Sequence, residues 1–114
     1  MENIVYNELL TRGYSVDVGI VVVNGKNVEG KSIRKQFEVD FVTNMGSQRY
    51  YIQVALDLST EKKQQQEYNS FRNIPDSFKK IVIVGGTSSP WRNDEGYVIM
   101  GIKYFLLNSD SMEF

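Results

Sequence analysis

The sequence of 114 residues contains neither cysteine nor histidine. Without cysteine, this chain forms no disulfide, thiolate zinc centre or iron–sulfur cluster, and it has no cysteine nucleophile. Without histidine, it has no imidazole metal ligand and no serine or cysteine nucleophile activated by a histidine. Any chemistry must therefore come from carboxylates, amides, hydroxyls, tyrosine, lysine and arginine.

Long apolar runs and an excess of one charge are also lacking. Thirteen basic and fourteen acidic residues give a formal net charge of −1, which argues against strong sequence-independent binding of nucleic acid but allows a local basic patch. No stretch approaches the roughly 18 consecutive apolar residues of a membrane-spanning helix. No apolar signal-peptide segment follows Met1. We therefore expect a cytoplasmic protein that does not enter the membrane.

The length suits one domain with one hydrophobic core, and its apolar patterns predict an α/β fold. Helices are expected over residues 2–12 and 60–73, where Gly13 and Thr60 supply a stop and a cap. The expected strands cover residues 14–23, 37–42, 50–58 and 81–84, with one or two more within 97–107. Short turns make the first three strands antiparallel, whereas the second helix makes the third and fourth parallel.

Alternation in the second and third strands predicts one apolar and one polar face. The apolar set, which we expect on the core side, comprises Phe37, Val39, Phe41, Ile52, Val54 and Leu56. Asp40 and Gln53 belong to the other face and become neighbours if the two strands pair across the intervening turn. Periodicity alone favours a solvated face for them. A helical wheel places Glu2 on the inward side of the first helix, whereas fraying of the first turn would leave it in solvent.

The order of these elements resembles the restriction-endonuclease-like, or PD-(D/E)xK, core. Glu2 on the first helix, Asp40 late in the second strand and Ile52-Gln53-Val54 in the third carry the resemblance. It implies an αβββαβ core with a central mixed sheet flanked by helices. In that family a helix glutamate, a strand aspartate and a Glu-x-Lys motif assemble around Mg²⁺, which prefers oxygen ligands. The resemblance thus implies a catalytic and metal site at Glu2, Asp40 and Gln53.

The chain resembles one subgroup more closely. Residues 2–6, 8–10, 12–14, 18–19, 39–42, 51–55 and 105–107 are similar to the C-terminal domain, DUF4143, of prokaryotic AAA-type ATPases. This resemblance implies that residues 1–114 form a single nuclease-like domain excised from a longer polypeptide, with the upstream ATPase domain as a partner. These residues contain no Gly-x-x-x-x-Gly-Lys-Ser/Thr motif, so we do not expect this fragment to bind ATP.

Two residues depart from the nuclease pattern, because Gln53 and Ala55 stand where the family has glutamate and lysine. Three interpretations stay open. The domain is a degenerate nuclease core kept for binding, an active Mg²⁺-dependent nuclease in which Lys62 or Lys63 replaces the missing lysine, or a docking module that regulates the ATPase. We favour the first and third together, because a fold does not fix an activity.

Basic residues form two groups that suit contacts with nucleic-acid phosphates. Lys31, Arg34 and Lys35 lie in or beside the polar segment after the first strand, and Lys62 and Lys63 open the second helix. If both groups flank one groove, we expect them to contact the phosphates of bound DNA. The alternative, which the net charge favours, is that both groups are simply solvated.

Overall fold

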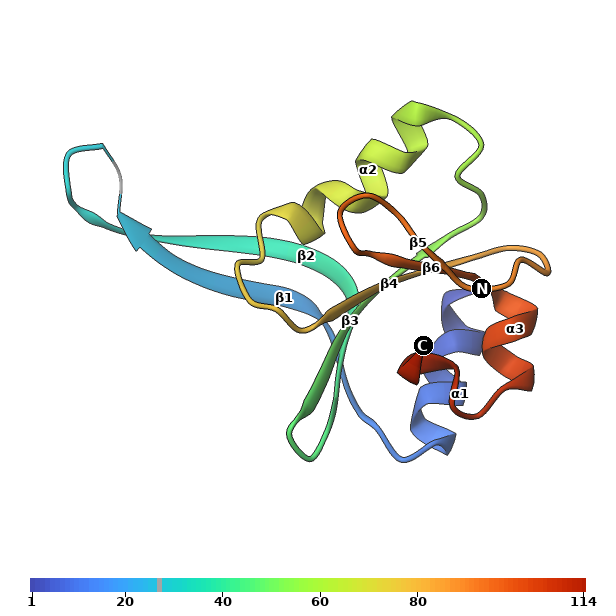
Figure 1. Ribbon diagram of the computed structural model, residues 1–114. Helices are drawn as coiled ribbons and strands as arrows, with labels where there is room; N and C mark the ends of the chain where they lie inside the picture. The colour runs from blue at the N-terminus through green and yellow to red at the C-terminus, as the bar shows by residue number, and fades with distance from the viewer. Residues whose placement is uncertain (27) are drawn as a thin grey trace.

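The computed structural model describes residues 1–26 and 28–114, and the side chains of all of these except 20–24, 33 and 35–37. The described chain forms one mixed sheet with helices on both of its faces (Figure 1). The elements are α1 (Glu2–Thr11), β1 (Ser15–Lys26), β2 (Ser32–Met45), β3 (Gln48–Ala55), α2 (Glu61–Arg72), β4 (Lys79–Val84), β5 (Trp91–Arg92), β6 (Val98–Gly101), α3 (Ile102–Leu107) and a 3₁₀ turn (Ser111–Glu113).

The sheet has the strand order β1-β2-β3-β4-β6-β5. Strands β1, β2 and β3 form an antiparallel meander, and β3 pairs with β4 in parallel across the α2 connection. Both features agree with the pairing expected from the sequence. Strand β4 is buried on both faces, as its unbroken apolar run indicates, and it also pairs in parallel with β6. Among the described residues, none of the helices is long and apolar enough to cross a membrane.

Each face of the sheet carries its own hydrophobic core. Helices α1 and α3 pack on one face, where Leu9 and Phe105 join Ile52 and Ile83. Helix α2 covers the other face, where Phe71 packs with its neighbours in a second cluster. The mixed sheet flanked by helices that the family resemblance implies is therefore confirmed, and the solvated face that periodicity alone favours is not observed at Gln53. The helix of a parallel crossover lies against the sheet that it connects.

Two residues of β3 show this correction most clearly. Gln53 is 8% exposed and Ala55 is 7% exposed, and both lie on the face that α2 covers. Leu56, by contrast, is 80% exposed, although the alternation assigned it to the core. Strand β3 ends at Ala55, so the alternation no longer applies at position 56.

A β-bulge in β2 changes the expected faces at Asp40. Val18 pairs with Phe41 whereas Gly19 pairs with Val39, so Asp40 is the extra residue on its strand. As a result Val39 packs in the cluster under α2 and Phe41 in the cluster under α1, although strict alternation places them together. The bulge needs glycine on the partner strand, because a Cβ at Gly19 would overlap the main-chain carbonyl oxygen of Val39. The side chain of Phe37 lies outside the described residues.

The chain after β4 also differs from the expectation. Only Val98–Gly101 of the segment 97–107 is a strand, and Ile102–Leu107 is the helix α3. Short apolar runs do not separate helix from strand by periodicity, and here Phe105 gains burial by facing α1. The short strand β5 lies between residues 84 and 97, where the sequence patterns predict no strand. Strands β1 and β2 are longer than expected, because their hairpin projects past the body of the sheet (Figure 1).

Candidate functional site

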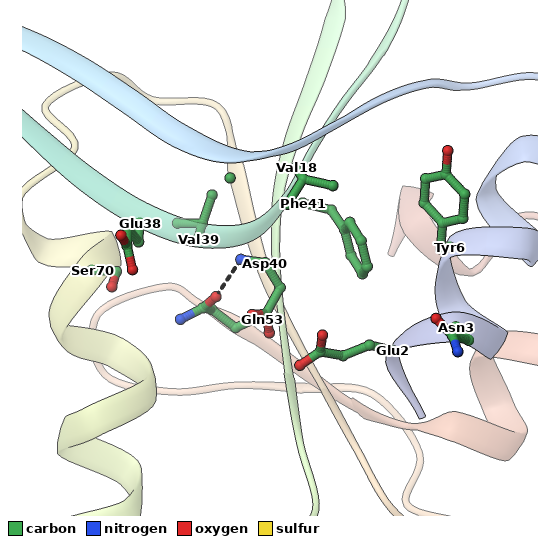
Figure 2. A pocket seen from close by; sticks show the side chains of 11 residues that line it. Glu2, Asn3, Tyr6, Val18, Glu38, Val39, Asp40, Phe41, Gln53 and Ser70 are labelled. Carbon is green, nitrogen blue, oxygen red and sulfur yellow. Dashed lines mark hydrogen bonds between the residues drawn. The ribbon is translucent and has the colours of Figure 1, made fainter.

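A pocket of about 830 Å³ opens where β2 and β3 separate. The ladder between these strands ends at the pair Phe41 and Ile52, and the pocket opens at this end of the ladder. It is lined by Glu2, Asn3, Tyr6, Val18, Gly19, Glu38, Val39, Asp40, Phe41, Gln53 and Ser70. The pocket thus brings together Glu2, Asp40 and Gln53, the three residues that the family resemblance singled out. Figure 2 shows Glu2 extending from α1 toward Asp40 and Gln53.

The side chains of Gln53 and Asp40 each accept a hydrogen bond from the main chain of the opposite strand at this fork. The main-chain N–H of Asp40 donates to Gln53 Oε1 at 2.7 Å, and the main-chain N–H of Val54 donates to Asp40 Oδ2 at 2.7 Å. Gln53 Nε2 also donates to the carbonyl oxygen of Glu67 on α2, at 3.5 Å. Beyond the end of the main-chain ladder, these side-chain oxygens accept the hydrogen bonds of the main-chain N–H groups. The amide of Gln53 therefore holds two strands and a helix together.

The carboxyl groups at the fork lie in a partly buried, negatively charged environment. Burial raises the pKa of Asp40, the charge of Glu2 raises it further, and the hydrogen bond from Val54 opposes both. Burial also raises the pKa of Glu67 on α2, with smaller contributions from the charges of Asp40 and Glu2. Sequence reasoning missed Glu67. The sequence feature that could have identified Glu67 is its position four residues before the apolar Phe71, because residues with this spacing lie on the same face of a helix.

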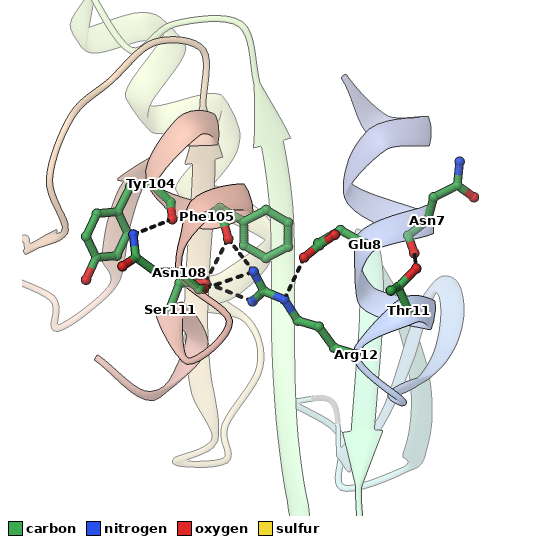
Figure 3. Close-up of polar contacts among 8 residues, drawn as sticks. All are labelled: Asn7, Glu8, Thr11, Arg12, Tyr104, Phe105, Asn108 and Ser111. Atoms are coloured by element: carbon green, nitrogen blue, oxygen red, sulfur yellow. Dashed lines mark hydrogen bonds and ion pairs between the residues drawn. The ribbon is translucent and has the colours of Figure 1, made fainter.

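Helix α1 carries Glu2, and Arg12 fixes the orientation of this helix. The Arg12 side chain is 7% exposed, and its Nε pairs with Glu8 Oε1 at 3.1 Å. Its two terminal nitrogens donate to the carbonyl oxygens of Phe105 and Asn108 and to Ser111 Oγ, and the guanidinium lies 4.4 Å from the centroid of the Phe105 ring. Figure 3 shows how this one side chain joins the end of α1 to α3.

The donor set at the fork does not match the one that the resemblance implies for Mg²⁺. Within residues 1–26 and 28–114, no three acidic side chains are placed to hold one metal ion. Gln53 Oε1 is already engaged by the N–H of Asp40. The methyl group of Ala55 lies in the cluster under α2 and offers nothing to a water or a phosphate. An ammonium group is therefore missing where the family has its lysine.

Lys62 and Lys63 do not line the pocket. Lys63 Nζ pairs with Asp57 Oδ2 at 3.0 Å, and Lys62 borders a separate hollow on the outer side of α2. The pKa of Asp57 is lowered to about 2, first by the hydrogen bond from the Ser59 hydroxyl and also by those from the Ser59 N–H and Lys63. Lys63 is thus engaged in a surface ion pair rather than directed at the carboxylates of the fork.

The other basic group lies toward the end of the β1–β2 hairpin. Lys31 and Arg34 are exposed there, and Lys31 lies 3.9 Å from Glu29. The side chain of Lys35 lies outside the described residues. Among the described residues that line the pocket, none is lysine or arginine. The described basic side chains of both groups, those of Lys31, Arg34, Lys62 and Lys63, therefore lie outside the lining of this pocket.

The chain is similar to one family model and to a curated protein. Residues 1–105 match the model of a domain of unknown function, DUF4143. An uncharacterized protein of Haemophilus influenzae is 36% identical over 85 residues, which are 75% of this chain and 17% of that protein. The chain thus spans less than a fifth of the relative's length.

Proposed function

The chain belongs to the DUF4143 family, and we propose that it is a nuclease-like domain without metal-dependent cleavage that serves as a binding domain of a longer ATPase. The proposal depends on the identity and contacts of Gln53 and Ala55. Gln53 stands where the nuclease motif has a ligand acid, and its amide is used to hold the strand fork. Ala55 stands where the motif has lysine.

The order of elements supports a nuclease-like core. Helix α1, the meander β1–β2–β3, the crossover helix α2 and the parallel strand β4 follow one another as in an αβββαβ arrangement. The ATPase portion of the proposal rests on the family resemblance. It is compatible with a relative of which this chain covers only 17%.

The charges of the pocket favour binding over cleavage. Hydrolysis of a phosphodiester needs a charged group or metal ion that stabilises the developing negative charge. In the described part of the chain, the pocket lining contributes carboxylates and no basic side chain. A protein partner suits this surface better than a nucleic acid does.

Metal binding and DNA cleavage, measured together, test the proposal. We expect no Mg²⁺- or Mn²⁺-dependent cleavage of duplex, single-stranded or branched DNA, with or without ATP, beyond that of Asp40→Ala. Calorimetry should detect no Mn²⁺ binding tighter than about 1 mM. The variant Gln53→Glu, which restores the family's acid, should bind Mn²⁺ more tightly than the natural sequence. Metal-dependent cleavage by the natural sequence that disappears in Asp40→Ala would overturn the proposal.

Glu67 supports a second candidate, an active Mg²⁺-dependent nuclease with altered ligands. Its charge interacts with those of Asp40 and Glu2, although the three carboxylates are not placed to hold one metal ion in this structure, so Glu67 would have to move toward the other two to take the place of the missing glutamate. This candidate predicts that Glu67→Gln abolishes metal-dependent cleavage as completely as Asp40→Ala does. Cleavage that survives Glu67→Gln would exclude this role for Glu67.

A further inference from the structure

In the described part of the chain, the mixed sheet has two free edges that differ in how they are protected. Strand β5 forms one edge, is two residues long and follows Pro90. Strand β1 forms the other edge and runs for 12 residues, from Ser15 to Lys26. Proteins protect a free edge with a short strand, a proline or charged side chains. The β5 edge has the first two of these features, whereas β1 is long and contains no proline.

Charge is also scarce along β1. Its only charged residues are Asp17 and Lys26, which stand near its two ends, and the sequence between them is Val-Gly-Ile-Val-Val-Val-Asn-Gly. The β-branched residues in this stretch favour a strand. The outer main-chain N–H and C=O groups of such an edge strand can pair with a further strand. The main chain of β1 is therefore a surface on which another strand can be added.

The outer part of β1 belongs to a two-stranded arm. Strand β2 pairs with β3 only from Phe41 to Met45, whereas it pairs with β1 from Ser32 to Asn44. Within the described chain, residues 32–39 thus have β1 as their only neighbouring strand, and this arm projects past the body of the sheet (Figure 1). Two strands alone are marginally stable in water, and additional strands stabilise them. Addition of a strand would therefore stabilise the arm.

Charge distinguishes the two edges of this arm. The β2 edge carries Arg34, Lys35 and Glu38 in its sequence, and the side chains of Arg34 and Glu38 are exposed. Charged side chains of this kind oppose the addition of a strand. The β1 edge has no charged residue between positions 17 and 26. A new strand is therefore expected beside β1 and not beside β2.

The order of charges along β1 favours a second copy of the chain in antiparallel orientation. Antiparallel pairing of two β1 strands brings Asp17 of one copy near Lys26 of the other, and does so at both ends of the ladder. Parallel pairing would place each charge beside the same charge of the other copy, which is repulsive. Antiparallel pairing also uses the same edge of both copies, so the contact closes as a dimer. Only the protected β5 edges then stay free.

We propose that two copies of this chain associate through antiparallel pairing of their β1 strands. The two sheets become one sheet, and the arms form a four-stranded antiparallel ribbon in the order β2-β1-β1-β2. The inference goes beyond the proposed function and does not depend on it, because it concerns the main chain of β1 and uses no residue of the fork.

Paramagnetic broadening between two copies tests this arrangement by NMR. Because the chain has no cysteine, Ser15→Cys creates a single site for a nitroxide label at the exposed start of β1. The nitroxide-labelled chain is mixed with ¹⁵N-labelled natural chain, so that only contacts between copies broaden a signal. We expect broadening of the amide signals of Gly25 and Lys26. Those of Val16 and Asp17 should stay sharp, because the two ends of an extended strand of this length lie about 35 Å apart.

Sedimentation equilibrium measures the self-association itself. We expect a dimer with a Kd on the order of 0.1 mM. Asp17→Lys gives both ends of β1 the same charge and should weaken the dimer about fivefold at low salt. The double variant Asp17→Lys/Lys26→Asp exchanges the charges and should recover the original affinity. Asp94→Lys makes the same change at an exposed position beside β5, on the opposite edge of the sheet, and should alter the Kd less than about twofold.

The inference would be overturned by a chain that stays monomeric at about 1 mM. Broadening of Val16 and Asp17 in place of Lys26 would show parallel pairing, and broadening at β5 would show that the other edge is used; either result would contradict the proposed dimer. Equal weakening by Asp17→Lys and Asp94→Lys would do the same, because it would place no charged contact at β1. These readouts include neither metal binding nor DNA cleavage, so the proposed function fails or holds separately.

Discussion

The main-chain N–H of Asp40 donates to Gln53 Oε1 at 2.7 Å, one residue beyond the last pair of the β2–β3 ladder. The side chain of Gln53 thus replaces a main-chain acceptor at the point where the strands part. Gln53→Ala removes this acceptor and leaves a partly buried N–H unpaired. We expect the free energy of unfolding to fall by about 1–3 kcal/mol.

Urea denaturation measures this effect, with Gln66→Ala as the control. Gln66 is an exposed residue of α2, so its truncation should stay within about 0.5 kcal/mol. If the two alanine variants are equally stable, Gln53 does not hold the fork.

The bulge at Asp40 predicts strong intolerance of a side chain at Gly19. A Cβ there overlaps the carbonyl oxygen of Val39, so the two strands must move apart. We expect Gly19→Ala to lower the free energy of unfolding by about 3 kcal/mol. Gly30→Ala is the comparison, because Gly30 has open space around its Cα but a φ of 78°. Its cost should be about 1 kcal/mol, from conformation alone. A reversed order of the two variants in thermal unfolding would contradict the bulge geometry.

The raised pKa of Asp40 predicts a stability that falls as pH rises. The folded state holds this proton more tightly than the unfolded chain does. The free energy of unfolding therefore decreases as pH rises from the ordinary pKa of 3.8 through the raised folded value. Asp40→Asn keeps an acceptor for the Val54 N–H but does not titrate. The stability of the natural sequence relative to Asp40→Asn should therefore decline over this interval in urea titrations. A difference that grows with pH would contradict the assignment.

The pKa of Asp57, in a surface turn, is shifted downward, opposite to the shift of Asp40. Its pKa is lowered to about 2, and hydrogen bonds from Ser59 come before Lys63 among the causes. Ser59→Ala keeps the N–H donor and loses the hydroxyl, so the pKa of Asp57 should rise. NMR titration of the Asp57 carboxyl carbon between about pH 1.5 and about pH 6 would measure this pKa in the natural sequence and in Ser59→Ala. Lys63→Ala should raise this pKa less than Ser59→Ala does, and the reverse order would assign the main effect to the ion pair.

The contacts of Arg12 predict that even the conservative substitution Arg12→Lys lowers the stability of the domain strongly. Its guanidinium hydrogen-bonds to four partners on α1, α3 and the following turn. An ammonium group cannot reproduce this planar arrangement of donors. We expect Arg12→Lys to cost about 2–4 kcal/mol. Arg49→Lys, on an exposed arginine in β3, should cost less than about 0.5 kcal/mol. Equal unfolding midpoints for the two lysine variants would exclude an anchoring role for Arg12.

The elements with local signals were predictable. Gly13, with a φ of 93°, follows α1, and the Thr60 hydroxyl accepts from the N–H of Lys63 at the start of α2. Both are caps that depend on neighbouring residues only. The parallel pairing of β3 and β4 followed from the length of the connection between them.

The remaining features depend on residues far apart in the chain. The bulge at Asp40 exists because Gly19, 21 positions earlier, admits the carbonyl of Val39, and α3 forms because Phe105 meets α1. At the candidate site, the family motifs predicted Glu2, Asp40 and Gln53, which do line one pocket. Glu67 matched no motif of the family, and only the packing of α2 on the sheet places it near Asp40.

The contact between Arg12 and Ser111 also has a consequence for biosynthesis. Arg12 leaves the ribosome before its partners Phe105, Asn108 and Ser111, which follow it by 93, 96 and 99 residues. Until they emerge, the apolar side of α1 has no α3 beside it and the guanidinium has no acceptors outside its own helix. The domain therefore acquires its final cooperativity after translation of almost the whole segment, and ribosome-bound chains that stop before residue 105 should remain sensitive to protease.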